Sequence, residues 1–215
     1  MTSSSPIAPS TTDDATVLIQ PADNAVARTV LNAAVATISA RGYHGTSVRD
    51  IAVAAGVSPG TLYNYFGSKQ ALLATLMCRA MDILIEASQR ALRAAAPDPA
   101  ARLDALIDAH VRVHAVSGRE SLIGNSELRS LEPDYLRQVI GKRDEQQRLF
   151  DRVVAEGVSQ GCFRVADTRI AARYVVTACT AVAIWYRPRG EIDVEQLVRH
   201  YQNLSRQLLG CEESR

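Results

Sequence analysis

The sequence predicts an all-α protein in which a small helix-turn-helix domain precedes a larger helical domain. From Asn24 onward, apolar residues recur every three or four positions, which is the spacing of helices that bury one face. Alanine is abundant and only 5% of residues are aromatic, a balance that favours packed helices over a β-sandwich. No alternating run of Val, Ile and Thr lies between hairpin turns, so we expect no sheet.

Composition and charge narrow the class of protein. The 215 residues are 47% hydrophobic and carry a net charge of +1, so bulk charge gives no argument for nucleic acid or a membrane. The longest uncharged apolar run, residues 174–186, is shorter than the roughly 20 residues of a membrane span. Residues 1–27 lack the basic residues of a signal peptide, and the four cysteines have no zinc-type spacing. We expect a soluble, cytoplasmic protein with reduced thiols.

Cap residues set the boundaries of the first helices. Residues 1–23 are rich in Ser, Thr and Pro without a sustained period, and we predict a disordered tail there. Ser47 and Asp50 have the spacing of a capping box, and Ser58 precedes Pro59 as a cap precedes a first-turn proline. The first four predicted helices cover about residues 24–42, 47–56, 58–67 and 68–96.

Five further helices are predicted over about residues 100–117, 121–130, 133–160, 167–186 and 193–209. We assign residues 24–70 to the helix-turn-helix domain and residues 71–215 to a ligand-binding and dimerisation domain. The last two helices each carry an apolar stripe, and two such helices from each subunit would form a four-helix bundle. We therefore expect a homodimer through these two helices.

Residues 48–65 carry the most specific chemistry. Ile51, Val57 and Leu62 would fill the wedge between two helices, and Gly56 suits the left-handed turn between them. The second helix of such a unit enters the major groove of DNA. Here it contains no Lys or Arg and cannot bind guanine in bidentate fashion, but its hydroxyl and amide groups can bind bases or phosphates. Residues 24–70 hold four basic residues and one acid, which gives this region a modest positive charge. Judged by spacing alone, the region could also be a helical hairpin that binds no DNA.

A dense motif runs through this region: Ile51-Ala52-x2-Ala55-Gly56-Val57-Ser58-x-Gly60-Thr61-Leu62-Tyr63-x-Tyr65-Phe66-x-Ser68-Lys69. With its flanks, residues 28–77, it resembles the amino-terminal domain of the tetracycline-repressor (TetR) family. The resemblance implies a dimeric, all-helical repressor that binds duplex operator DNA and leaves it when a small molecule binds the larger domain. It implies DNA contacts at Thr46, Ser47, Arg49, Gly60, Thr61, Tyr63, Asn64, Tyr65 and Lys69. Pro59 stands where a polar or basic residue is more common, and Tyr65 replaces a frequent His, which bears on the operator sequence.

Three segments of the larger domain are similar to a TetR subgroup that responds to acyl-CoA thioesters of lipid or steroid catabolism. They are Asn125-x-Glu127-Leu128-Arg129, Val158-x2-Gly161-x-Phe163 and Trp185-Tyr186-x-Pro188-x-Gly190. The resemblance implies a small hydrophobic effector, an acyl-CoA being the first hypothesis. A xenobiotic- or antibiotic-responsive repressor, for example of an efflux pump, is the alternative, and a helical adaptor that binds no DNA is a remoter one. No nucleotide-binding, nucleophile or metalloprotease motif occurs, so we expect neither an enzyme nor a membrane partner.

Candidate ligand-binding residues lie in the larger domain: His110, His114, Asn125, Arg129, Arg148, Tyr174 and Trp185. His110 and His114 share one helix face and could bind a metal with Glu127, but no third ligand is fixed by spacing. We therefore predict that they line the pocket, with no metal and no cofactor. Trp185 would serve as a pocket wall or as part of the dimer core. Lys142 and five arginines (Arg129, Arg137, Arg143, Arg148 and Arg152) could bind CoA phosphates, but most of them fit a solvated face with Asp144, Glu145 and Asp151.

Overall fold

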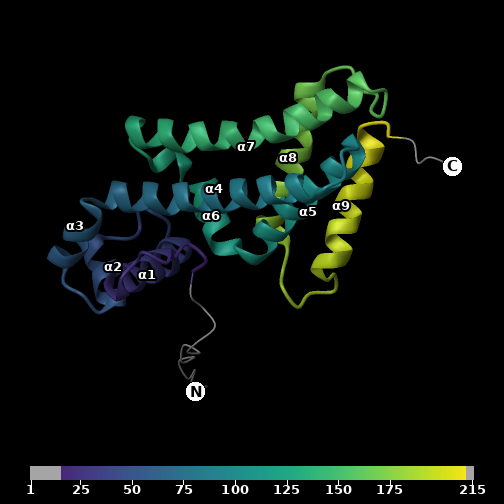
Figure 1. The fold of residues 1–215 in the computed structure, drawn as a ribbon. Helices are drawn as coiled ribbons and strands as arrows, with labels where there is room; N and C mark the ends of the chain where they lie inside the picture. Colours follow the sequence, from purple (N-terminus) through teal and green to yellow (C-terminus); the bar gives the residue numbers. More distant parts are fainter. Residues whose placement is uncertain (1–15, 212–215) are drawn as a thin grey trace.

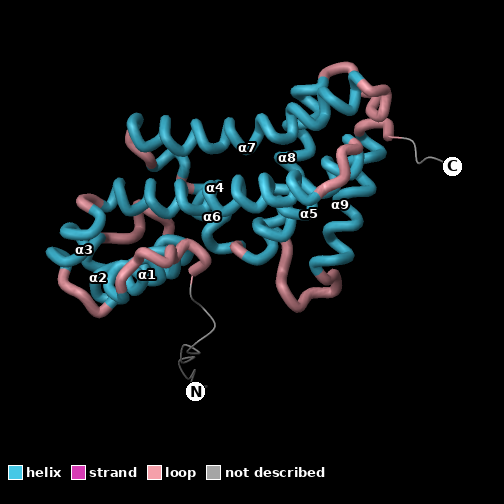
Figure 2. Tube along the Cα trace, in the orientation of Figure 1, coloured by secondary structure: helices cyan, strands magenta, loops and turns pink. Residues whose placement is uncertain are grey.

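The protein is a bundle of helices arranged along one long central helix (Figure 1). The structure is a computed structural model that describes residues 16–211. Its helices are α1 (Ala25–Arg41), α2 (Val48–Ala55), α3 (Pro59–Phe66), α4 (Lys69–Ala94), α5 (Pro99–Val116), α6 (Gly118–Ser126), the 3-10 turn η1 (Leu128–Ser130), α7 (Pro133–Ser159), α8 (Thr168–Trp185) and α9 (Val194–Leu208). No strand occurs between residues 16 and 211, and the all-α prediction is confirmed (Figure 2). In the same part of the chain, every helix is too short or too polar to span a membrane.

Local signals place the first helices where the sequence predicts them. The Ser47 hydroxyl accepts a hydrogen bond from the Asp50 N–H at 3.1 Å, and the Ser47 N–H donates to the Asp50 carboxylate at 2.7 Å. Gly56 ends α2 with φ 66°, in the left-handed region that favours glycine. Ser58 caps α3, and Pro59 occupies its first position, where no N–H is needed. The turn between α2 and α3 is thereby fixed by residues inside the motif.

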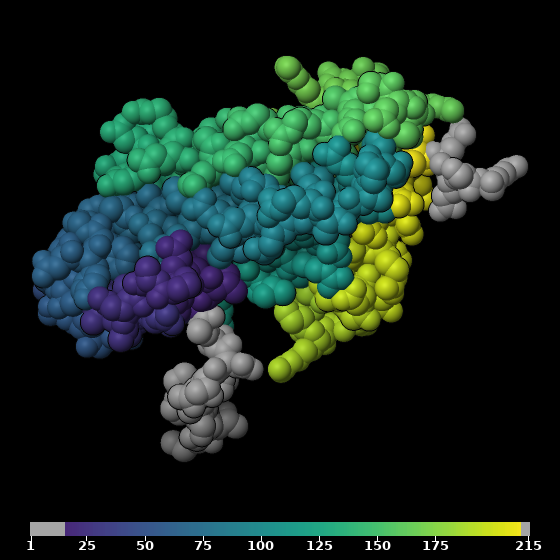
Figure 3. Space-filling view, in the orientation of Figure 1, coloured from purple at the N-terminus to yellow at the C-terminus, as the bar shows by residue number. Residues whose placement is uncertain are grey.

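Two hydrophobic cores share α4. The first joins α1, α2 and α3 to the amino-terminal half of α4, through Leu72 and Met77, and also includes Ile123 of α6 and Val139 of α7. The second lies among α5, α7, α8 and α9, around Phe150, and Leu92 near the end of α4 packs against it. On the face shown in Figure 3, α7 lies above α4 and the first described residues lie below it. The first core thus continues past residue 70, and buried side chains, rather than a linker, join the two halves of the chain.

Residues 16–23, predicted to belong to a disordered tail, are packed against the helices; residues 1–15 lie outside the described part of the chain. We call residues 16–23 the amino-terminal strap. Leu18 is 1% exposed, and its carbonyl oxygen accepts a hydrogen bond from Arg79 Nη1 at 3.1 Å. Arg79 also pairs with Asp23 at 2.6 Å, and this hydrogen-bonded pair lowers the pKa of the Asp23 carboxyl. The prediction was wrong because the apolar run at 17–19 is too short to show a period and its partners lie far along the sequence.

The boundaries of α6 also differ from the predicted residues 121–130. The helix begins at Gly118 and ends at Ser126, and η1 follows it. The Ser130 hydroxyl donates to Glu127 Oε2 at 2.9 Å, which stabilises a tight turn where a continuous helix was predicted.

We expect Leu18→Ala to lower the free energy of unfolding by about 2–4 kcal/mol, because it removes a fully buried side chain and leaves a cavity under the strap. Val17→Ala is the matched control: Val17 is 40% exposed, and its loss should cost well under half as much. Urea denaturation measures both values. Equal effects of the two substitutions would show that the strap does not pack as described.

Candidate DNA interface and ligand pocket

α3 lies at one end of the molecule (Figure 1), and its polar side chains are exposed. Leu62 is fully buried in the first core, whereas Tyr63 and Tyr65 are 48% and 43% exposed. Asn64 is exposed as well, and the Thr61 hydroxyl lies 2.8 Å from the Ser58 hydroxyl. α3 is thus held to the core by one apolar side chain and exposes hydroxyl and amide groups. This arrangement is typical of a helix that enters the major groove of DNA.

Two basic side chains flank α3. Arg49 on α2 is exposed and forms no ion pair within residues 16–211. Lys69, at the start of α4, donates to the Tyr43 carbonyl oxygen at 2.6 Å and lies 3.9 Å from the centre of the Tyr43 ring. Partial burial lowers the pKa of the Lys69 ammonium. Lys69 therefore holds α4 against the connection between α1 and α2, and its half-buried ammonium group is only partly accessible to solvent.

Thr46 does not contribute its side chain to this surface. It is 1% exposed, and its hydroxyl donates to the carbonyl oxygens of Gly42 at 2.8 Å and Thr37 at 3.2 Å. We correct the predicted DNA contact at Thr46 to a structural role, since the hydroxyl fixes the end of α1. The other predicted contact residues are exposed or half-buried on α2, α3 and their flanks: Ser47, Arg49, Gly60, Thr61, Tyr63, Asn64, Tyr65 and Lys69.

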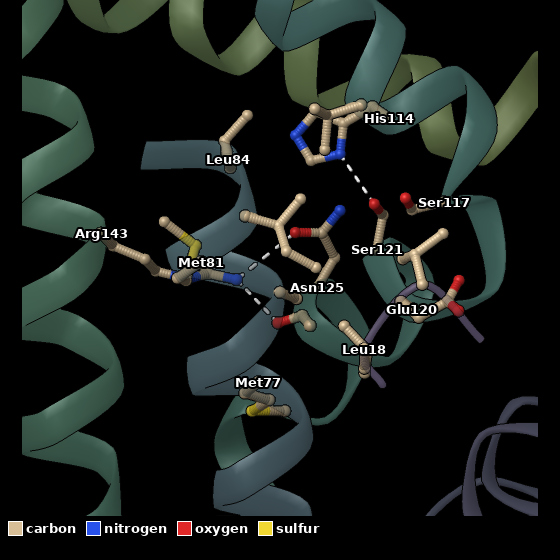
Figure 4. A pocket seen from close by; sticks show the side chains of 15 residues that line it. Leu18, Met77, Met81, Leu84, His114, Ser117, Glu120, Ser121, Asn125 and Arg143 are labelled. Atoms are coloured by element: carbon tan, nitrogen blue, oxygen red, sulfur yellow. Dashed lines mark hydrogen bonds between the residues drawn. The ribbon is translucent and has the colours of Figure 1, made fainter. Parts of the chain in front are cut away.

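A pocket of about 360 Å³ lies between α4, α5, α6, α7 and α8. Its apolar wall includes Met81 and Leu84 of α4 and Val176 and Ile184 of α8. A narrower hollow adjoins it toward the strap, and the two share residues of α4, α5, α6 and α7. Figure 4 shows this hollow, with Leu18 of the strap at one side. A mostly apolar cavity of this volume with a few polar groups is typical of a small-molecule site.

A chain of hydrogen bonds runs along one wall of the pocket. Gln146 Nε2 lies 2.9 Å from the Ser88 hydroxyl and 3.4 Å from His110 Nδ1, and as a donor it makes this ring nitrogen an acceptor. His110 Nε2 then carries the proton and faces two acceptors at 3.0 Å, His114 Nε2 and the Thr180 hydroxyl, while His114 Nδ1 lies 2.8 Å from the Ser121 hydroxyl. Burial lowers the pKa of His110 well below its usual value and that of His114 to about 4. Both rings are neutral at pH 7 in this arrangement.

Arg143 is a half-buried cation that lines both the pocket and the adjoining hollow. Its guanidinium Nη2 donates to the Gly124 carbonyl oxygen at 2.7 Å and to Asn125 Oδ1 at 3.4 Å, at the end of α6 (Figure 4). Within the described residues no carboxylate lies within ion-pair distance of it. Burial lowers the pKa of the Arg143 guanidinium, which nevertheless stays charged.

The structure brings three of the seven predicted ligand-binding residues to the pocket: His110, His114 and Asn125. The other four do not line it. Arg129 and Arg148 are exposed, and Tyr174 and Trp185, 63% and 46% exposed, lie on the outer face of α8.

Sequence reasoning missed Gln146 and Thr180, and it did not separate Arg143 from the exposed basic residues of the same helix. No local signal marked Gln146, since adjacent residues are only about 100° apart on a helix and both glutamines could lie on its polar side. No three His, Cys, Asp or Glu side chains in residues 16–211 are grouped to hold a metal ion.

Comparisons with known proteins match both halves of the chain to one family. Residues 30–76 match the model of bacterial regulatory proteins of the tetR family, and residues 96–209 match the tetracyclin repressor-like C-terminal domain.

Individual relatives cover most of the chain. The HTH-type transcriptional repressor KstR2 of Rhodococcus jostii is 29% identical over 180 residues, which are 81% of this chain and 86% of that protein. The fatty acid metabolism regulator protein of Bacillus subtilis is 27% identical over 73% of this chain and 81% of that protein. The solved structure of the ketosteroid transcriptional regulator KstR2 of Mycobacterium tuberculosis has a TM-score of 0.75 at 26% identity, covering 86% of this chain and 94% of that one.

The neutral histidines predict an acid-sensitive fold. The unfolded chain protonates His114 near pH 6.5, while the folded protein does so only near pH 4, so stability is complete above pH 6.5 and falls as pH drops toward 4. At ~1.4 kcal/mol per pKa unit, this residue accounts for a loss of about 3 kcal/mol over that window. Urea denaturation at a series of pH values measures it. His114→Gln should reduce the slope to the part that His110 contributes, and His200→Gln, at an exposed position on α9, should leave it unchanged; equal slopes in both variants would contradict the assignment.

Proposed function

The chain belongs to the TetR family of bacterial DNA-binding transcriptional regulators, and we propose that it is a homodimeric repressor released from a pseudo-palindromic operator by an acyl-CoA thioester of lipid or steroid catabolism. One observation carries the proposal: α4 begins beside the exposed helix α3 and continues into the wall of an apolar pocket. A regulator of this kind acts in the cytoplasm, where its operator lies.

The proposed DNA contacts are Ser47, Arg49, Gly60, Thr61, Tyr63, Asn64, Tyr65 and Lys69. Because α3 carries no cation, base reading falls to Thr61 and Asn64, whose hydroxyl and amide groups suit base edges. Arg49 and the tyrosine hydroxyls suit phosphate oxygens, which set the register on the duplex. Lys69 supports the interface by holding the start of α4 against Tyr43.

We place the dimer interface on α8 and α9. Each helix buries one side in the second core and leaves apolar side chains on the other: Ile170, Tyr174, Ile184 and Trp185 on α8, and Leu204 and Leu208 on α9. Exposed apolar side chains clustered on two neighbouring helices are typical of a subunit interface. A two-fold dimer would set two α3 helices into successive major grooves, with half-sites about 34–36 Å apart or slightly more.

The pocket and the matched relatives support a lipid-derived effector. Met81, Leu84, Val176 and Ile184 give the pocket an apolar wall, and its volume of about 360 Å³ suits an acyl chain or fused rings. Two relatives are named as a ketosteroid regulator and a fatty acid metabolism regulator. The CoA group, which is too polar for this wall, would lie at the mouth, where exposed Arg173 meets its phosphates.

The positions of α4 and α6 explain how an effector could release the protein from its operator. Both helices line the pocket, and both contribute to the first core, which holds α1, α2 and α3. A ligand that favours another placement of α6 against α4 would alter the spacing of the two α3 helices. A coupling of ~1–3 kcal/mol lowers operator affinity about 5- to 150-fold.

Arg49→Ala should weaken binding to duplex DNA from the protein's own upstream region, because it removes a phosphate contact. The slope of log affinity against log salt concentration should fall by about 1. Fluorescence anisotropy across a salt series measures both effects. Arg93→Ala, an exposed arginine near the far end of α4, is the matched control and should bind as the wild type does. Binding that ignores salt would count against the interface and in favour of the adaptor alternative.

Substitution of Glu for both Tyr174 and Leu204 should give monomers with strongly reduced operator affinity, because it buries charge in the proposed interface. Light scattering after size exclusion gives the oligomeric state. Val116→Glu adds a charge at a position that is 73% exposed on α5 and should leave the state unchanged. A double variant that remains dimeric would place the interface elsewhere.

Acyl-CoA thioesters of graded chain length should raise the melting temperature and reduce DNA anisotropy at the same concentrations, whereas CoA alone should do neither. The two readouts together tie binding to release. A protein that ignores every thioester yet responds to apolar drugs would instead be the xenobiotic-responsive repressor.

A further inference from the structure

We propose that the effector carries a carboxylate inside the pocket and that Arg143 is its counter-ion. The inference deepens the proposed function and rests on it: it concerns which chemical group of the effector is recognised, and where. A carboxylate of this kind is supplied either by a free apolar acid or by the far end of a dicarboxylic acid held as a mono-thioester.

The first observation is the incomplete set of partners around Arg143. Only Nη2 makes hydrogen bonds, to Gly124 O and Asn125 Oδ1, so that Nε and Nη1 each keep a donor for an oxygen of the ligand. The acids nearest in the pocket walls are Asp144 and Glu120. Neither lies within ion-pair distance of Arg143 in the described structure, and Glu120 accepts the Thr16 hydroxyl instead. A cation kept in a mostly apolar pocket without a protein anion is costly unless a ligand supplies one.

The second observation is an unused acceptor one helical turn further along α7. Gln146 is 2% exposed and lines the pocket, and its Oε1 is the buried side-chain oxygen in residues 16–211 that lacks a hydrogen-bond partner. Its amide nitrogen lies within hydrogen-bond distance of Ser88 and His110, and in this orientation Oε1 is left without a partner. Arg143 and Gln146, three residues apart on one helix face, thus offer a cation and an acceptor to the same occupant. A carboxylate accepts from Arg143 but cannot satisfy Oε1, which needs an O–H or N–H donor on the body of the occupant, and pure hydrocarbon satisfies neither group.

The charge available favours a carboxylate over the phosphates of CoA. Arg143 lines both hollows, and its guanidinium lies near Met81, Leu84 and Asn125 (Figure 4), whereas exposed Arg173 lines only the larger pocket. One half-buried cation neutralises one negative charge, whereas the CoA phosphates carry several and are strongly hydrated. The pocket therefore fits a singly charged group attached to an apolar body, with any CoA group remaining at the mouth.

The same side chain connects this anion to the DNA-binding region. Gly124 lies in the last turn of α6, whose first turn is held to the strap by the hydrogen bond between Thr16 and Glu120. The strap in turn binds α1 through Thr16 N–H and Asn32 Oδ1 at 2.8 Å. An anion bound at Nε or Nη1 would pull the guanidinium toward itself and strain the Nη2 hydrogen bonds at the end of α6, so carboxylate binding and operator release should occur together.

The test compares matched ligands of ten carbons: decanoate, methyl decanoate, decanoyl-CoA and the mono-CoA thioester of decanedioic acid. For the wild type we expect decanoate to bind about 10- to 100-fold more tightly than the methyl ester, the range for hydrogen bonds to a charged group. The dicarboxylic thioester should exceed decanoyl-CoA by a similar factor. Whichever acid binds more tightly identifies the source of the carboxylate. Calorimetry gives the affinities, and DNA anisotropy gives the release.

Three variants separate recognition from folding. Arg143→Gln keeps donors for Gly124 but no charge, and should abolish both preferences; Arg143→Lys keeps the charge and should retain part of each. Arg148→Gln, at an exposed arginine of the same helix, should behave as the wild type. Operator affinity without ligand shows that each variant is folded.

Two results would overturn the inference: a wild type that does not bind the acids in preference to their neutral partners, or a preference that survives in Arg143→Gln. If decanoyl-CoA still releases operator in either case, the proposed function stands and only the carboxylate site fails.

Discussion

The structure depends on α4 belonging to two cores at once. Its 26 residues rise by about 1.5 Å each, so it spans about 39 Å as one continuous helix. Lys69 fixes its start to the connection between α1 and α2, Leu72 and Met77 are buried with the DNA-binding helices, and Leu84 lines the pocket. Because packed interiors resist gradual deformation, the release mechanism proposed above requires a change at the pocket wall to travel along α4 as a displacement.

Several polar groups that line the pocket lower the stability of the fold, because they are buried without a full set of hydrogen-bond partners. Burial lowers the pKa of His110 and His114 and so keeps both rings neutral well below pH 7, and the Gln146 oxygen and the Arg143 guanidinium remain incompletely satisfied. An apolar wall throughout would pack more tightly and cost less. Such groups are retained where a ligand completes them, and in this protein they gather on α5, α6 and α7 around a single cavity.

Most of the fold follows from local sequence, whereas the pocket does not. Ser47, Gly56, Ser58 and Pro59 specify the α2–α3 unit within a dozen residues, because caps and turns act on their immediate neighbours. The strap escaped prediction because Leu18 is held by α1, α4 and α6, and sequence alone does not show such distant contacts. Arg143 and Arg148 are five residues apart on one helix, about 140° around its axis, so one faces the pocket and the other faces solvent. The sequence shows two arginines of the same kind on one helix, and only the packing of α7 shows which of them is half-buried.

α8 links the pocket to the proposed interface through its two sides. Val176 and Thr180 line the pocket, whereas Tyr174 and Trp185 lie on the exposed apolar side. Ile184 belongs to both, since it lines the pocket and is 58% exposed. A partner subunit seated on α8 would therefore cover part of the pocket mouth, and an occupant of the pocket would bear on the helix that sets the subunit spacing. In this proposal the effector and the DNA select between the same two dimer geometries. A ligand that binds one geometry more tightly therefore changes the distance between the two α3 helices, although it binds far from the DNA.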